Sequence, residues 1–146
     1  LAPVEKRVGP LDLVIVGPND PKAMVQHTQE CRDRGYPFLA DPSQQLAFGD
    51  GDLIRPLIDG AEILFSNEYE ASLITQKTGW SAEEILSRVG TWVVTLGPQG
   101  VRIDRAGEES VVVAAVPVAA GWLPQVTRFS VHAAPSGMAW SVRPSL

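Results

Sequence analysis

The 146-residue sequence is poor in cysteine, in basic residues and in long hydrophobic runs, and each shortage excludes a class of protein. The single cysteine, Cys31, cannot form a disulfide within the chain, which argues against a disulfide-stabilised secreted domain and fits a reducing, cytoplasmic location. No apolar run is long enough to cross a membrane, and no signal peptide is visible. The net charge is −5 and no Lys/Arg stripe occurs, so a nucleic-acid partner is not expected.

The last part of the chain contains no acidic residue: all 17 Asp and Glu residues lie at or before Glu109. Residues 110–146 instead hold four prolines, Trp122 and Trp140, and no period of 2 or 3.6 runs through residues 120–135. Two interpretations stay open: a disordered or partner-bound tail, or a segment whose reading frame is shifted. Two tryptophans and many apolar residues fit disorder poorly, which favours the second.

Between residues 11 and 96, short apolar runs alternate with segments of helical spacing. The apolar runs predict strands at residues 11–16, 36–40, 62–66 and 91–96. The helical spacing and end signals predict helices at residues 21–34, 53–58, 68–77 and 82–89. A β-hairpin is predicted around Ala106-Gly107. This order is typical of an α/β fold with a doubly wound parallel sheet and helices on both faces.

The length suffices for one domain with a core, but not for two ordinary domains. The chain begins with Leu1 rather than Met, so we expect a piece of a longer protein. The predicted organisation is a connector at residues 1–10, an incomplete α/β domain at 11–116 and an anomalous tail at 117–146.

One helix start stands out, at residues 66–74 (SNEYEASLI). Asn67 occupies an N-cap position and Glu70 follows three residues later, which is a capping box. Taken alone, this pattern indicates a helix start and nothing more. A second stretch favours a further role: the strand end at residues 95–100 (TLGPQG) can turn backbone N–H groups toward a phosphate. Since ligands of such sheets lie beyond the carboxyl ends of the strands, both stretches and Asp41 are predicted at one ligand edge.

Residues 67–70 (NEYE) and 94–100 (VTLGPQG) resemble the ribokinase-like (PfkB) family of sugar and nucleoside kinases. Residues 35–45 (GYPFLADPSQQ) look most like bacterial carbohydrate or adenosine kinases. The resemblance covers roughly residues 10–116 and matches the second half of the family's nucleotide-binding α/β domain. It implies transfer of the γ-phosphoryl group of ATP to a hydroxyl of a small sugar or nucleoside, with Mg²⁺ as cofactor.

The resemblance also implies roles for single residues. Asn67 and Glu70 would lie near Mg²⁺ and the phosphates, Glu70 through water, since a carboxylate can hold the hydrated ion without stripping its shell. Thr95, Gly97 and Gly100 would lie along the nucleotide, and the two glycines would let the backbone approach it closely.

Asp41 matches a position near the substrate and metal. Local roles remain open beside these, because Asp41 can cap a turn before Pro42 and both glycines can be ordinary turn residues.

Two parts of the family pattern are missing. The half that carries the sugar-binding Gly-Gly signature and the lid is absent. Where the family has a D-T-x-G-A-G-D-like segment, with its anion hole and general base, residues 119–129 read AAGWLPQVTRF. Residues 136–140 (SGMAW) resemble the helix that follows in relatives, so a frame disturbance between about 119 and 135 is one explanation.

Loss of a general base costs on the order of 10²–10⁴ in rate. The sequence therefore predicts a kinase fragment that is inactive alone. The alternative is a non-catalytic nucleotide-binding or protein-interaction module, and a homodimer is left open.

Overall fold

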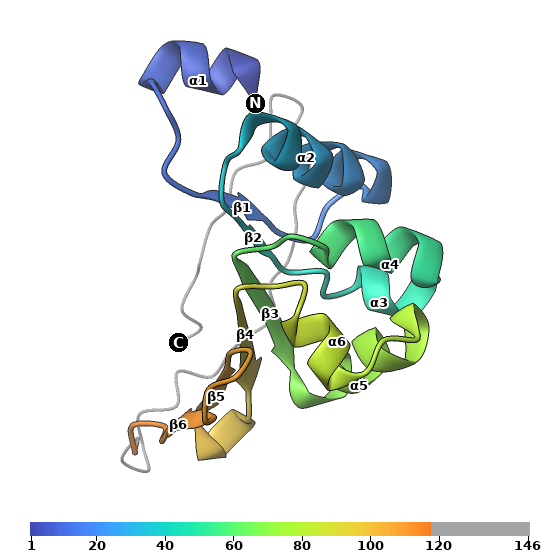
Figure 1. Ribbon diagram of the computed structural model, residues 1–146, viewed down its shortest axis with the longest axis vertical. Coiled ribbons are helices and arrows are strands. Elements are labelled where there is room, and N and C mark those ends of the chain that lie inside the picture. Colours follow the sequence, from blue (N-terminus) through green and yellow to red (C-terminus); the bar gives the residue numbers. More distant parts are fainter. Residues whose placement is uncertain (118–146) are drawn as a thin grey trace, which may run out of the picture. The chain divides into compact units, whose positions relative to one another are not determined.

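A computed structural model describes residues 1–117, and its residues 1–115 form one compact unit (Figure 1). That unit contains a six-stranded sheet, helices and a 3₁₀ turn. In chain order the elements are α1 (Ala2–Val8), β1 (Val14–Val16), α2 (Pro21–Arg34), β2 (Phe38–Ala40), α3 (Gln45–Phe48), α4 (Gly51–Ile58), β3 (Ile63–Asn67), α5 (Glu68–Thr78), α6 (Ala82–Leu86), β4 (Thr91–Thr95), η1 (Gly97–Gln99), β5 (Val101–Asp104) and β6 (Val111–Val113).

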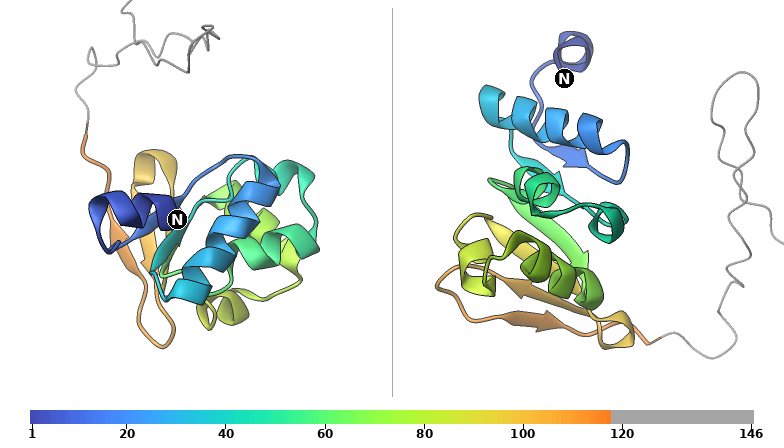
Figure 2. Two further views of the ribbon diagram at one scale, coloured as in Figure 1. Left: turned by 90° about the horizontal axis from the view of Figure 1, so that it is seen from above. Right: turned by 90° about the vertical axis from the view of Figure 1, so that its right-hand side faces the viewer.

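The strands pair in the order in which they occur along the chain, β1-β2-β3-β4-β5-β6. The first four are parallel, and β5 and β6 continue the sheet as an antiparallel hairpin. Crossovers between parallel strands are right-handed, so a sheet that always grows in one direction carries its crossover helices on one face. In agreement, α4 packs between α2 and α5, and Figure 2 shows these helices gathered on one side of the strands.

The predicted α/β fold is confirmed, and it is incomplete as expected. The predicted hairpin is also present, with its turn at Gly107, which has a positive φ of 73°. No reversal of strand order occurs within residues 1–115, so the helices expected on the second face are not part of the described unit. No helix within residues 1–117 is long and apolar enough to cross a membrane.

The core lies between the sheet and the crossover helices. From the sheet it takes Phe38, Leu64, Trp92 and Val94, whose side chains alternate toward that face. The indole Nε1 of Trp92 donates to Ser66 Oγ over 3.0 Å, which satisfies both buried polar groups and ties β4 to β3. The helices contribute a buried set of larger side chains: Met24, Leu46, Ile54, Leu57, Ile58, Ile74 and Ile85.

The opposite side of the sheet carries a second apolar surface, which we call the open face. The strand register places its side chains in two rows, Ile15–Leu39–Ile63 and Phe65–Val93–Ile103. All six are at least partly exposed, and Ile15 is 70% exposed. The same sheet therefore has one buried face and one apolar face without helices.

The ends of α2 follow the sequence signals. Asp20 is the N-cap of the helix, since its carboxylate accepts from the N–H of Ala23 over 3.0 Å. Gly35 ends it in the left-handed conformation, with φ 69°.

The start of α4 differs from the prediction, because the helix begins at Gly51 and Pro56 lies well inside it. Pro56 is the sixth of the eight residues of α4. The ring leaves one carbonyl of the preceding turn without its usual donor. Two side chains of α2 support this stretch from outside: Thr28 Oγ1 and Arg32 Nη1 both donate to the carbonyl of Pro56, over 2.9 and 3.1 Å.

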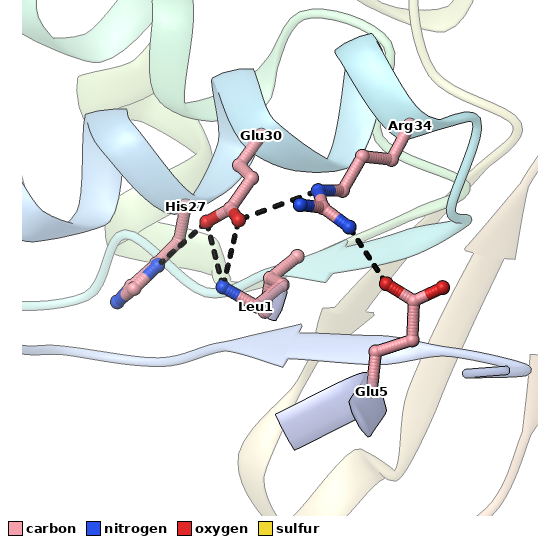
Figure 3. A network of polar contacts seen from close by, with 5 residues as sticks. All are labelled: Leu1, Glu5, His27, Glu30 and Arg34. Atoms are coloured by element: carbon pink, nitrogen blue, oxygen red, sulfur yellow. Dashed lines mark hydrogen bonds and ion pairs between the residues drawn. The ribbon is translucent and has the colours of Figure 1, made fainter. Parts of the chain in front are cut away.

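Residues 1–10 are not merely a connector, because they contain α1. Pro3 in the first turn and Arg7 in the last suit a short helix, since Pro fits the first turn and a cation suits the C-terminal end of the dipole. Figure 3 shows how α1 is tied to α2: Arg34 of α2 pairs with Glu5 of α1 at 2.6 Å. Single-sequence signals predicted no helix here because none of its residues is buried.

Candidate functional site

Asn67 is both the last residue of β3 and the N-cap of α5. The predicted capping box is formed: Asn67 Oδ1 accepts from the N–H of Glu70 over 2.8 Å, and Glu70 Oε2 accepts from the N–H of Asn67 over 2.9 Å. Each of these bonds uses only one of the two polar atoms at the end of the side chain. The amide NH₂ of Asn67 and the second oxygen of Glu70 have no hydrogen-bond partner within the described residues.

Thr95 lies directly opposite Asn67 in the β3–β4 register. Both residues end their strands, both are exposed, and both continue the open face toward the carboxyl ends of the strands. Residues paired in this way have side chains only a few ångströms apart. The sheet therefore brings Asn67 and Thr95 together, although 27 residues lie between them in the sequence.

Asp41 follows β2 at the same edge of the sheet. Its N–H donates to the carbonyl of Val16, the last residue of β1, over 3.0 Å. Burial of the carboxyl group and, second, the negative charge of Glu70 raise the pKa of Asp41 above its ordinary value of 3.8. The negative charge of Glu70, in the first turn of α5, therefore acts on the carboxyl group that follows β2.

The two glycines of the 95–100 stretch differ in their surroundings. Gly97 has a left-handed φ of 56°, and nothing lies within 4 Å of the place where a Cβ would be. Gly100 has φ 108°, and a Cβ there would collide with the carbonyl oxygen of Val113 and with the backbone that follows β6. Gly100 is therefore required by the packing of the hairpin, whereas Gly97 leaves open space above a turn at the ligand edge.

This edge suits a hydrated cation and phosphates. Hard cations such as Mg²⁺ prefer carboxylate oxygens and keep several waters. Asp41 and Glu70 supply such oxygens, and their mutual repulsion is relieved when a cation lies between them. Within residues 1–117 no group of three or more His, Cys, Asp or Glu side chains is placed to hold a metal ion directly.

One residue of this edge was not singled out from the sequence. Tyr69 lies in the first turn of α5, between the two capping residues, and its side chain is 72% exposed. Single exposed apolar side chains are common on protein surfaces, so Tyr69 belongs to this edge by its position alone. Its sequence position inside NEYE was the available signal. The general-base segment and the tail from residue 118 onward lie outside the described residues.

The family of the chain follows from comparison with known proteins. The sequence pattern of the pfkB family carbohydrate kinases matches residues 4–120. The chain belongs to the pfkB family. The match covers most of the 146 residues, and it includes Asp41, the capping box of α5 and the 95–100 stretch.

Solved structures of nucleoside kinases and of a ribokinase are similar to this chain. A nucleoside kinase from Burkholderia thailandensis in complex with inosine is 40% identical over 75% of this chain and 36% of its own, with a TM-score of 0.70. A nucleoside kinase of Methanocaldococcus jannaschii is 20% identical over 77% and 38%, with a TM-score of 0.65. Arabidopsis thaliana ribokinase, complexed with ribose and ATP, is 22% identical over 74% and 36%, with a TM-score of 0.53. The last two show the fold alone. The chain spans little more than a third of the length of these proteins.

Proposed function

We propose that this chain is the phosphate-binding part of a sugar or nucleoside kinase, and that its edge at Asp41, Asn67 and Glu70 holds Mg²⁺ and the phosphates of ATP. The carrying observation is that the ends of β2, β3 and β4 lie at one edge of the sheet, with Asp41 after β2 and Glu70, in the first turn of α5, near enough to add to the raised pKa of Asp41. Asn67 and Thr95 lie side by side next to them. Such an edge is where α/β sheets place their ligands.

Each residue has a distinct task in this proposal. Glu70 and Asp41 attract the metal through its water shell, and the amide NH₂ of Asn67 donates to a phosphate or to a metal-bound water. Thr95 and the turn at Gly97 lie along the nucleotide. Mg²⁺, when bound, would offset the charge of the transferring phosphoryl group, which is one of the contributions that phosphoryl transfer needs beside positioning of the reactants.

The acceptor is proposed to be a nucleoside rather than a simple sugar. The 40% identity to a nucleoside kinase crystallised with inosine supports this choice. The residues that would contact the acceptor are expected mainly outside residues 1–117, so the choice rests on that comparison and not on contacts of this chain.

The chain alone is proposed to have no useful kinase activity. A general base is needed to take the proton of the acceptor hydroxyl, and residues 110–146 contain no Asp or Glu to supply it. A coupled assay with ATP and adenosine, inosine, ribose or fructose tests this directly. Turnover well above background would overturn it.

A titration with Mg-ADP and Mg-ATP, followed by calorimetry, separates the proposal from its alternative. Binding without turnover, lost when Mg²⁺ is left out, supports a phosphate-binding part of a kinase. Absence of binding would overturn the proposed site. Binding that survives replacement of Glu70 would favour a nucleotide-binding module that works through other residues.

The remaining partners stay predictions. A small-molecule substrate in the complete enzyme, a cytoplasmic location and no nucleic-acid partner are proposed from the family and the composition. Size exclusion with light scattering tests whether this chain forms a homodimer.

A further inference from the structure

A buried polar pair lies next to the ligand edge, and the proposed site does not include it. Ser66 and Trp92 are only 4% and 3% exposed, and the indole Nε1 of Trp92 donates to Ser66 Oγ. Both strands of this pair lie within the described residues, where this is the one hydrogen bond between a side chain of β3 and a side chain of β4. Ser66 directly precedes Asn67, so the bond is formed one residue away from the proposed site.

The burial pattern of β3 and β4 does not by itself fix the register between them. Side chains alternate between the two faces of a sheet, so a shift by one residue would turn the buried set outward. A shift by two residues would keep that set inward, because β3 buries Leu64 and Ser66 while β4 buries Trp92 and Val94. Backbone bonds can also re-form after such a shift, since every residue here offers the same N–H and C=O groups.

The bond between the two side chains does distinguish the registers. Trp92 lies opposite Leu64, and its indole reaches two positions forward along β3 to Ser66. A two-residue shift moves one strand along the other by roughly 6–7 Å, which is far beyond hydrogen-bond distance. The indole N–H and the hydroxyl would then be buried without partners, which folded proteins rarely tolerate. The pair therefore favours the observed register over the shifted ones.

The same register brings Asn67 opposite Thr95. We propose that Ser66 and Trp92 are positioning residues of the nucleotide site, because their buried hydrogen bond fixes the β3–β4 register that places Asn67 opposite Thr95. The inference rests on the proposed function for what the site binds. The register itself can be measured without any nucleotide, so the two can fail separately.

Ser66→Thr and Ser66→Val are a matched pair of variants, because the new side chains have the same shape and only Thr keeps a hydroxyl. Strain from the larger side chain is common to both. Ser66→Thr is expected to bind Mg-ADP as the wild type does. Ser66→Val is expected to bind roughly tenfold more weakly, because small displacements of binding groups are costly. Isothermal titration at a temperature where both variants are folded measures this, and equal affinities of the two would overturn the proposal.

Thr28→Val is the control for a loss of stability without a change of register. Thr28 is fully buried in α2, and its hydroxyl donates to the carbonyls of Val25 and Pro56 over 3.0 and 2.9 Å. Its removal is expected to lower the free energy of unfolding, as measured in urea, and to leave the Mg-ADP affinity unchanged. If Thr28→Val weakened binding as much as Ser66→Val does, destabilisation alone would explain the effect and the proposal would be overturned.

Disulfide formation reads the register directly. Neighbouring strands lie roughly 4.8 Å apart, so cysteines opposite each other are within disulfide range, whereas cysteines two positions out of register are not. The only native cysteine, Cys31, is fully buried and gives little background. In a chain with Asn67→Cys and Thr95→Cys, adding Ser66→Val is expected to slow oxidation roughly fivefold, the usual weight of one hydrogen bond, whereas adding Ser66→Thr is not.

These oxidation rates keep the proposal testable whatever the chain binds. Equal rates with Ser66→Val and Ser66→Thr would show that the register does not depend on the hydroxyl, and would overturn the proposal. A wild-type chain that fails to bind Mg-ADP would overturn the proposed function instead. The expected difference in rates would in that case still support Ser66 and Trp92 as the pair that fixes the register.

Discussion

Two capping boxes of the same construction start neighbouring helices, and only one of them lies at the ligand edge. Asn67 with Glu70 begins α5, and Ser81 with Glu84 begins α6, each with both reciprocal bonds formed. They differ in what precedes them. Asn67 is the last residue of a central parallel strand, whereas Ser81 follows a loop on the surface. The local bonds are alike, so function depends on where the sheet places the cap.

Gly97 and Gly100 also have the same residue type in different surroundings. Their replacement gives the largest expected effect on stability. Gly100→Ala is expected to destabilise the fold by roughly 3–5 kcal/mol, because it combines backbone strain with a collision against Val113. Gly97→Ala is expected to cost only about 1–2 kcal/mol, the cost of a left-handed non-glycine residue. Urea unfolding followed by circular dichroism measures both. Equal losses would contradict the assignment of Gly100 to hairpin packing.

The charge at the ligand edge is tested next. Glu70→Gln keeps the capping box, since Gln serves at this position as well as Glu, and removes only the negative charge. Mg-ADP affinity is expected to fall roughly ten- to a hundredfold, in line with the loss of about 1.5–3 kcal/mol for a hydrogen bond to a charged group. Glu84→Gln is the control and is expected to bind as the wild type does. Isothermal titration would refute the contrast if both variants behaved alike.

Removal of the caps themselves is expected to have similar effects at both helices. Asn67→Ala and Ser81→Ala should each lower the free energy of unfolding by about 1 kcal/mol, the usual cost of losing an N-cap. Only Asn67→Ala should also weaken Mg-ADP binding. Urea midpoints and calorimetry on the same two proteins check this. A stability loss confined to one of them would show that the caps are not energetically equivalent.

The smallest expected effect concerns pH. Because the pKa of Asp41 is raised in the folded chain, the unfolded chain ionises first as the pH rises. The folded state therefore loses stability above the ordinary pKa of 3.8 and keeps it below. Asp41→Asn is expected to raise the thermal midpoint at pH 7 and to leave it unchanged at pH 3. Scanning calorimetry without Mg²⁺ would contradict this if the variant were less stable at pH 7.

Helix ends were predicted well where a capping residue bonds to the backbone of the first or last turn. The capping box of Asn67 and Glu70 began α5 as predicted, because its two side chains bond to backbone groups only three residues away. α1 and α3 were missed, since α1 buries no side chain and α3 buries only Leu46. Their apolar periodicity is therefore too weak to detect.

The sequence predicted which residues belong to the candidate site, but not how they lie relative to one another. Spacing alone could not show that Asn67 lies opposite Thr95 or that Glu70 raises the pKa of Asp41, because strand register depends on the whole sheet. Nor could it separate Gly97 from Gly100. Both are glycines in a turn, and only the position of β6 distinguishes them.

The strand order has a consequence for how the protein is made. Each of the first three strands pairs with the strand that comes next in the sequence, with a single crossover between them. Contacts of short sequence separation form quickly, and a chain that emerges gradually from the ribosome can complete them one after another. The ligand edge then acquires its residues in steps: Asp41 first, Asn67 with Glu70 next, and Thr95 only when the fourth strand has been synthesised.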